Sequence, residues 1–231
     1  MNVLKPQLLS HQLVEAMGMK VVDNNCTFLG DIWTEAELAA HYDLSRVTVR
    51  EAVKILSSKG LIKSTSKVGI QPLPMEDWNF FDYDVLRWLS LSKNNQKFAI
   101  EFAQLWQGVF CEATALATHN CEEEQIIQLA ALADKLPSST YEKTISVFIA
   151  ITLVILTATN NRFFIQLKKL VPILLKLLIR KNKSNEKLKQ LDAGYIRVCQ
   201  DLCSRDVSRA KRSAQYTSEA IAELQQAKVI G

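Results

Sequence analysis

The stretch "TEAELAAHYDLSRVTVREAVKILSSKGLIKSTSKVGIQPLP", residues 34–74, decides how the N-terminal third of the chain folds. It opens with Thr34 three residues before Glu37, a capping box that predicts the start of a short helix. A second helix is predicted to follow almost at once, with Ser45 as its N-cap. Residues 61–74 then resemble two short strands around a polar turn. Two helices joined by a tight turn and followed by a hairpin predict a winged helix-turn-helix.

The second predicted helix carries a basic face. Arg46, Arg50 and Lys54 recur every fourth residue, and Lys63 and Lys67 follow in the hairpin. A helix fits the major groove of DNA, where its side chains reach base edges, while hairpin lysines can contact phosphates. A run of charge alone is usually only a solvated face. The capping box, tight turn, basic helix and hairpin, arriving in this order, favour DNA binding.

These residues closely resemble the DNA-binding domain of GntR-type bacterial repressors, whose pattern runs S-E-x-x-L, then S-R-x-x-(V/L)-R-E-A, then L-x-x-x-G-L. By this resemblance Arg46 and Arg50 match DNA-contacting arginines, Thr48 matches the small polar residue beside them, and Gly69 matches the wing-tip glycine. The chain departs from the family at Ala36, where an arginine is frequent. The expected DNA contacts are Ser45, Arg46, Thr48, Arg50, Lys54, Lys67 and Gly69.

The regions on either side of this stretch are predicted to be helical. Residues 8–17, "LLSHQLVEAM", place apolar side chains on one stripe and predict a first short helix that ends at Gly18. Beyond residue 93 only Pro137 and Pro172 interrupt long segments with a 3.6-residue period. The stretch "MEDWNFFDYDVLRWL" is similar to the junction of the FadR-like branch of the family, and the helical region after this junction resembles that branch's FCD effector domain.

We therefore expect a mainly α protein with a winged helix-turn-helix and a C-terminal all-α helical bundle. The expected winged domain covers residues 1–76, and a linker covers 77–92. An all-α domain for effector binding and dimerisation is expected over residues 93–231.

The FCD resemblance implies a divalent metal held by Asp and His residues on three helices. In the family's register none of the four ligand positions carries a usual metal ligand, so we expect no metal and no other cofactor. Two alternatives stay open: the pocket binds an apolar or uncharged effector, or it has closed into plain core. The four ligand positions fall on Phe148, Thr152, Tyr195 and Thr217, and with Phe110 they make up the candidate effector pocket.

The composition limits the class of protein. The net charge of +4 is compatible with a polyanionic partner. Five cysteines without C-x-x-C pairing argue against a disulfide framework and for a reducing cytosol. The first residues lack the pattern of a signal peptide. No nucleophile–base pair, phosphate loop or H-E-x-x-H motif is found, so we expect no enzymatic activity.

Two apolar stretches raise the question of a membrane. The run within residues 146–164, "SVFIAITLVILTATNNRFF", is about 14 residues long, which is too short to span a bilayer. Residues 167–183, "LKKLVPILLKLLIRKNK", form a basic amphipathic pattern that fits a membrane-surface helix or a bundle helix with a solvated edge. We expect bundle helices and no membrane partner.

The resulting interpretation is a cytoplasmic transcriptional regulator that represses a metabolic operon, with sugar-acid catabolism implied by the resemblance. It is expected to bind double-stranded operator DNA as a homodimer, because one recognition helix reads only a half-site. The alternative is a protein-interaction or membrane-surface helical module whose helix-turn-helix no longer reads DNA.

Overall fold

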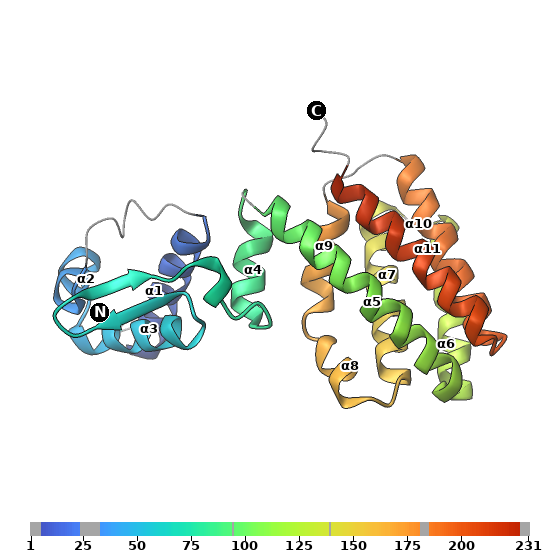
Figure 1. Cartoon of the computed structure of the whole chain (residues 1–231), viewed down its shortest axis with the longest axis horizontal. Helices are drawn as coiled ribbons and strands as arrows, with labels where there is room; N and C mark the ends of the chain where they lie inside the picture. The colour runs from blue at the N-terminus through green and yellow to red at the C-terminus, as the bar shows by residue number, and fades with distance from the viewer. Residues whose placement is uncertain (1–5, 24–32, 94, 139, 181–184, 227–231) are drawn as a thin grey trace, which may run out of the picture. The chain divides into compact units, whose positions relative to one another are not determined.

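The computed structural model describes residues 6–23, 33–93, 95–138, 140–180 and 185–226. The chain divides into two compact units, Met1–Asn95 and Gln96–Gly231 (Figure 1). The expected mainly α fold, a winged helix-turn-helix followed by an all-α region, is confirmed. Cys26 and the end of the basic amphipathic stretch, residues 181–183, lie outside the described residues.

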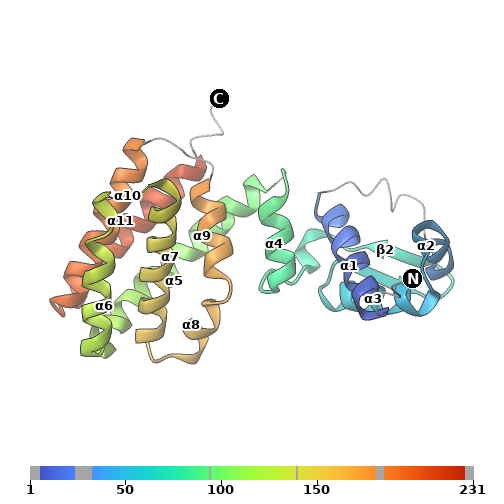
Figure 2. The same cartoon turned by 180° about the vertical axis from the view of Figure 1, so that it is seen from behind.

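The first unit is a three-helix domain with a hairpin and one further helix. Its core comes from the facing sides of α1 and α3, which pack together, as Figure 2 shows. The elements are α1 (Pro6–Val22), α2 (Glu35–Tyr42), α3 (Arg46–Ser58), β1 (Ile62–Thr65), β2 (Gly69–Pro72), the 3-10 helix η2 (Met75–Asp77) and α4 (Tyr83–Leu91).

Helix α1 is longer than the sequence pattern predicts. The predicted end at Gly18 is wrong, because α1 continues to Val22. The glycine at this position is explained by a contact with another helix of the same unit. A Cβ atom at position 18 would stand 2.5 Å from ring carbons of Trp88, which is itself fully buried. Gly18 therefore makes room for an aromatic side chain of α4 and does not end the helix.

The capping box that opens α2 is present. The side chain of Thr34 accepts a hydrogen bond from the backbone N–H of Glu37 at 3.2 Å. In return the Glu37 carboxylate accepts one from the Thr34 backbone N–H at 2.7 Å, which lowers the pKa of Glu37. The tight turn to α3 then passes through Asp43, whose φ of 53° is left-handed.

The hairpin is antiparallel, with Ile62 opposite Pro72 and Thr65 opposite Gly69. Its second strand is tied to the start of the helix-turn-helix, because the backbone N–H of Ile70 donates to the Trp33 carbonyl at 2.8 Å. This hydrogen bond fixes the position of the wing, which is the β1–β2 hairpin, relative to the helices beside it.

Partly buried ion pairs join helix α4 to the winged domain. Lys59 Nζ, at the C-terminal end of α3, lies 2.9 Å from both carboxylate oxygens of Asp82 and 2.8 Å from Asp84 Oδ2. Burial opposes the charge of Lys59, but hydrogen bonds with Asp84 and Asp82 outweigh it, so its pKa is raised. In the middle of α4, Arg87 and, at 3.0 Å, Trp88 Nε1 donate hydrogen bonds to Glu15 of α1. The segment expected as a linker, residues 77–92, thus packs within the first unit.

We expect Gly60→Ala to destabilise the first unit by roughly 2–4 kcal/mol. Gly60 has a φ of +74°, and an added Cβ atom would stand 2.2 Å from the Asp77 carbonyl oxygen. Urea unfolding followed by tryptophan fluorescence measures the loss. The control is Gly108→Ala in α5, where a Cβ atom meets nothing within 4 Å, so helix propensity alone should raise stability slightly. An unchanged urea midpoint for Gly60→Ala would contradict the tight turn between α3 and β1.

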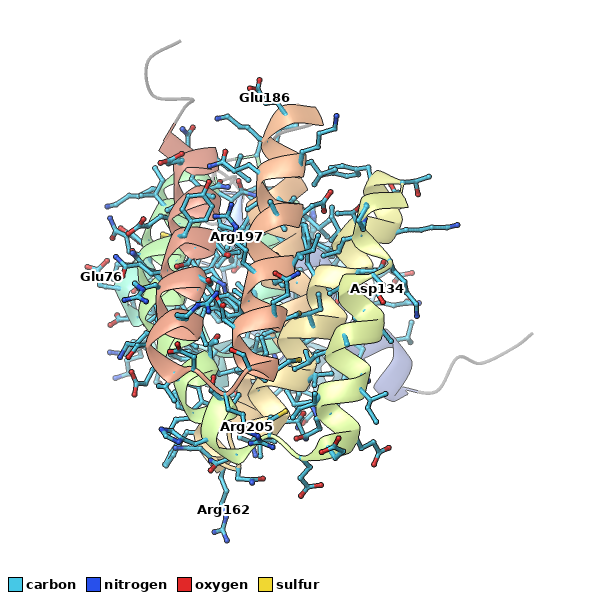
Figure 3. All side chains as sticks on the ribbon, turned by 90° about the vertical axis from the view of Figure 1, so that its right-hand side faces the viewer. Glu76, Asp134, Arg162, Glu186, Arg197 and Arg205 are labelled. Carbon is cyan, nitrogen blue, oxygen red and sulfur yellow. The ribbon has the colours of Figure 1, made fainter. Side chains whose placement is uncertain are left out.

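The second unit is a helical bundle. Helix α11 packs along both α5 and α10, and α7 packs against α5, α6 and α9. Figure 3 shows α10 and α11 side by side, with Glu186 at one end of α10 and Arg205 beyond the other. The elements are α5 (Gln96–Asn120), α6 (Glu123–Ala133), η3 (Leu136–Ser138), α7 (Tyr141–Ala158), α8 (Arg162–Leu167), α9 (Val171–Arg180), α10 (Asn185–Cys203) and α11 (Val207–Gln226).

Both apolar stretches lie in bundle helices. Among the described residues, one helix, α7, is long and apolar enough to cross a membrane by length and composition, and 56% of it is buried inside the unit. The basic amphipathic stretch forms the end of α8 and then α9, where Leu174, Leu175 and Leu178 are buried and Lys176 is exposed. The apolar side of α9 therefore faces the bundle.

Candidate nucleic-acid interface

Helix α3 has one buried side and one exposed side. Its buried side faces the domain core and consists of Val49, Ala52, Val53 and Leu56, together with Thr48. The exposed side carries the charges expected from the sequence, and its members are Arg46, Val47, Arg50, Glu51 and Lys54. The helix thus presents an exposed, mostly polar side with three basic side chains.

Ser45 and Thr48 together fix the start of α3. The Ser45 hydroxyl accepts a hydrogen bond from the backbone N–H of Thr48 at 3.1 Å, which makes Ser45 the N-cap. The two hydroxyl oxygens also lie 2.8 Å apart. Ser45 is exposed, whereas Thr48 is only 4% exposed. The structure therefore places Thr48 behind the helix surface, where its contact with Ser45 orients the cap.

The guanidinium group of Arg50 forms an ion pair with a residue of the neighbouring helix α2. Its Nε donates to Glu35 Oε2 of α2 at 3.0 Å, and its side chain remains 62% exposed. One turn further along, Lys54 Nζ pairs with Glu51 Oε1 at 3.0 Å on the open surface. Exposed pairs of this kind contribute little, about 0–1 kcal/mol, so Lys54 can exchange its partner for a phosphate group at small cost.

The wing supplies the remaining predicted contacts. Lys63 and Lys67 are exposed, on β1 and in the turn that follows it. The backbone turns back with φ of 66° at Lys67 and 99° at Gly69. A left-handed φ is unusual for a lysine, and it occurs here at the tip of the hairpin. The tip therefore combines a basic side chain with a glycine, whose missing side chain lets another molecule approach the backbone.

Val47 stands among these charges without a role predicted from the sequence. It is the second residue of α3, and its side chain is 72% exposed. One signal in the sequence could have pointed to Val47. Val47 is apolar but lies on the charged side of α3, whereas the other apolar residues of this helix are all buried or half-buried.

Residues 9–71 match the family model described as bacterial regulatory proteins, gntR family. The winged helix-turn-helix of this chain is therefore similar to the domain that this family model describes. Over 86 residues the chain is 31% identical to an uncharacterized HTH-type transcriptional regulator, YieP, of Escherichia coli K12. Over 78 residues it is 31% identical to the galactonate operon transcriptional repressor of the same organism. The two alignments cover 37% and 34% of both chains, so they span about a third of these relatives' length.

A solved structure extends the likeness of the fold beyond residues 9–71. It is described by the words "Lar controls the expression of the Listeria monocytogenes agr system and mediates virulence". It covers 97% of this chain and 98% of its own, with a TM-score of 0.58 and 14% identity. At that identity the likeness concerns the fold alone.

Four of the five residues of the candidate effector pocket, Phe110, Phe148, Thr152 and Tyr195, meet inside the second unit. Tyr195 stacks on Phe148 with ring centroids 4.2 Å apart, and Phe110 lies 5.8 Å from the same ring. The Thr152 and Tyr195 hydroxyls lie 3.4 Å apart, and burial raises the pKa of Tyr195. Thr217 donates to a carbonyl of its own helix at 2.7 Å. All five residues are 0% exposed, so this cluster is packed interior.

A metal ion does not fit this cluster. Its atoms are ring carbons and hydroxyl groups, and Phe148 and Tyr195 are stacked directly on each other. Hard cations need several oxygen ligands, and transition metals need nitrogen or sulfur. Among the described residues there is also no group of three or more His, Cys, Asp or Glu side chains that could hold a metal ion.

Asp192 of α10 gives the second unit a testable pH dependence. Its Oδ1 is buried with no hydrogen-bond partner among the described residues, and burial raises the pKa of Asp192 from 3.8 to about 6. The folded state therefore holds this proton more tightly than the unfolded state. Stability from this group is complete below pH 3.8 and is lost as the pH rises to about 6.

We expect Asp192→Asn to stabilise the second unit by about 1 kcal/mol at neutral pH, a value discounted for solvent screening of the partly exposed carboxyl group. The gain should vanish well below pH 3.8, where the wild-type carboxyl is protonated in both the folded and the unfolded state. Thermal unfolding of both proteins across this range measures the difference. A stabilisation that is equal at both ends of the range would show that the charge of Asp192 is not its cause.

Proposed function

We propose that this chain is a sequence-specific DNA-binding transcriptional regulator that inserts α3 into the major groove and places the hairpin tip beside it. One observation carries the proposal. Within a GntR-family domain, Arg46, Arg50 and Lys54 extend from the exposed side of a capped helix whose other side is the domain core. This is the arrangement that base readout requires, with rigid support behind and hydrogen-bond donors in front.

We further propose that the regulator is a repressor that acts as a homodimer on operator DNA in the cytoplasm. Similarity to the galactonate operon repressor supports repression and a sugar-acid operon as the first target to examine. A two-fold dimer would place two copies of α3 on half-sites about one helical turn apart.

For the second unit we propose an FCD-like bundle whose former effector site has become core. The complete burial of the aromatic cluster supports this alternative over an open pocket for an apolar effector. The Phe148–Tyr195 stack likewise supports a unit that binds no metal. Its role would then be to bring two winged domains together.

The decisive experiment compares binding of the full chain to its own upstream region and to random duplex DNA. The proposal expects tighter binding to the upstream region, and an affinity that falls steeply with salt because lysines and arginines displace counterions. Equal affinity for both duplexes would instead favour a helical interaction module that no longer reads DNA.

We expect Lys67→Ala to weaken binding to every duplex alike, because its expected partner is a phosphate group. The slope of log affinity against log salt should become shallower by about 0.9 for each Lys67 that contacts the duplex. Fluorescence anisotropy over a salt series measures both quantities. Lys97→Ala is the matched control, because Lys97 is 87% exposed on α5, outside the winged domain. A Lys67 variant that changes base preference but leaves the slope intact would contradict phosphate contact at the wing.

A further inference from the structure

Val47 is the most exposed large apolar side chain among the described residues of the first unit, at 72%. Folding does not account for it. A β-branched residue slightly lowers helix propensity, and a side chain this exposed adds little to the core. Single exposed apolar residues are common on protein surfaces, so the position of Val47 on α3 decides whether it has a role.

That position is central to the candidate DNA-binding surface. At about 100° per residue, Val47 lies between Arg50 and Glu51 around the helix axis. It also directly follows Arg46 in the first turn of α3, the end of a recognition helix that contacts base edges. An apolar group is thus surrounded by the polar groups that would line the groove.

We propose that Val47 reads the 5-methyl group of a thymine in the operator. This inference rests on the proposed function, because it requires α3 to enter the major groove. The side chain of valine has no hydrogen-bonding atom, so it selects a base only through an apolar contact. In the major groove the apolar partner is the methyl group of thymine. Val47 would therefore require a thymine next to the bases that the arginines contact.

The test begins with the duplex that the full chain enriches from a randomised library. Each thymine in that duplex is then replaced singly by uracil, which removes the methyl group and leaves base pairing intact. For the wild type we expect one thymine per half-site whose replacement weakens binding about fourfold, the effect of one apolar carbon group. Val47→Ala should bind the thymine and uracil duplexes equally, and Val47→Thr, which keeps one methyl group, should show an intermediate ratio.

Leu91→Ala is the control, because it also truncates an exposed apolar side chain of the first unit, at the end of α4. This variant should keep the full uracil penalty. If the penalty survives in Val47→Ala, or if no thymine shows one, the inference is overturned while the proposed function stands. If the chain enriches no duplex at all, the proposed function fails, and the assignment of Val47 fails with it.

Discussion

Replacing Arg50 with alanine is expected to abolish the preference of the chain for its operator over random duplex DNA. A bidentate contact between a guanidinium group and a base contributes about 1–3 kcal/mol of discrimination for each recognition helix. If two helices bind one operator, the loss applies twice. Competition binding between selected and random duplexes measures the ratio directly, and a ratio unchanged in Arg50→Ala would remove Arg50 from the base-reading surface.

Arg50→Lys separates charge from base readout at the same position. Lysine keeps the positive charge but lacks the planar fork, so affinity for random duplex and its salt dependence should persist while discrimination falls. This is the opposite of the result expected for Lys67→Ala. The two variants together test whether α3 specifies the sequence while the wing strengthens binding.

Glu35 gives a third variant at this site. Its carboxylate accepts a hydrogen bond from Arg50 Nε at 3.0 Å, so it orients the guanidinium group without lying on α3 itself. Glu35→Gln retains a hydrogen-bond acceptor and should preserve most of the discrimination. A loss as large as that of Arg50→Ala would mean that the charge of the pair, rather than its geometry, positions Arg50.

The local sequence patterns predicted the helix-turn-helix well because its determinants are local. The Thr34–Glu37 capping box and the Ser45 cap each act within three residues, and both are present. Local patterns gave a wrong end for α1 at Gly18. A glycine is needed there because a larger side chain would collide with Trp88, which is far along the chain. Local patterns also gave no means of predicting that Lys59 binds Asp82 and fastens α4 to the winged domain.

The family resemblance identified the helix that carries the candidate DNA contacts, but it did not predict which of its side chains are exposed. Thr48, which matches the small polar residue beside the arginines, is expected to contact DNA, yet it is only 4% exposed because it packs behind the N-cap. Val47, which the resemblance left without a role, is the residue that extends outward. On one turn of helix, neighbouring positions differ by about 100°, so exposure follows from packing against the domain and not from the motif.

The candidate pocket illustrates the same limit in the second unit. The family register placed Phe148 and Thr152 one turn apart on one helix and Tyr195 on another, and the structure brings the three side chains together. Whether such a cluster encloses a cavity depends on the volumes of all the side chains around it. Those volumes act across several helices, and no single stretch of sequence contains them.

The role of this cluster can be measured through Tyr195→Ala, which we expect to destabilise the second unit by about 3–5 kcal/mol. Tyr195 is fully buried, and its ring contacts Phe148 and Phe110 from two other helices. Removing the ring leaves a cavity that α5, α7 and α10 cannot fill without moving. Urea unfolding followed by circular dichroism measures the loss of stability.

Tyr195→Phe is the matched control, because it removes only the hydroxyl group that faces Thr152 at 3.4 Å. It should cost about 1 kcal/mol, the net contribution of one hydrogen bond. The comparison also decides between the two views of the cluster. In a binding pocket the ring would line open space, and Tyr195→Ala would cost little more than Tyr195→Phe. In a packed core most of the loss comes from the ring itself, so a large difference between the two variants would support a bundle that has lost its effector site.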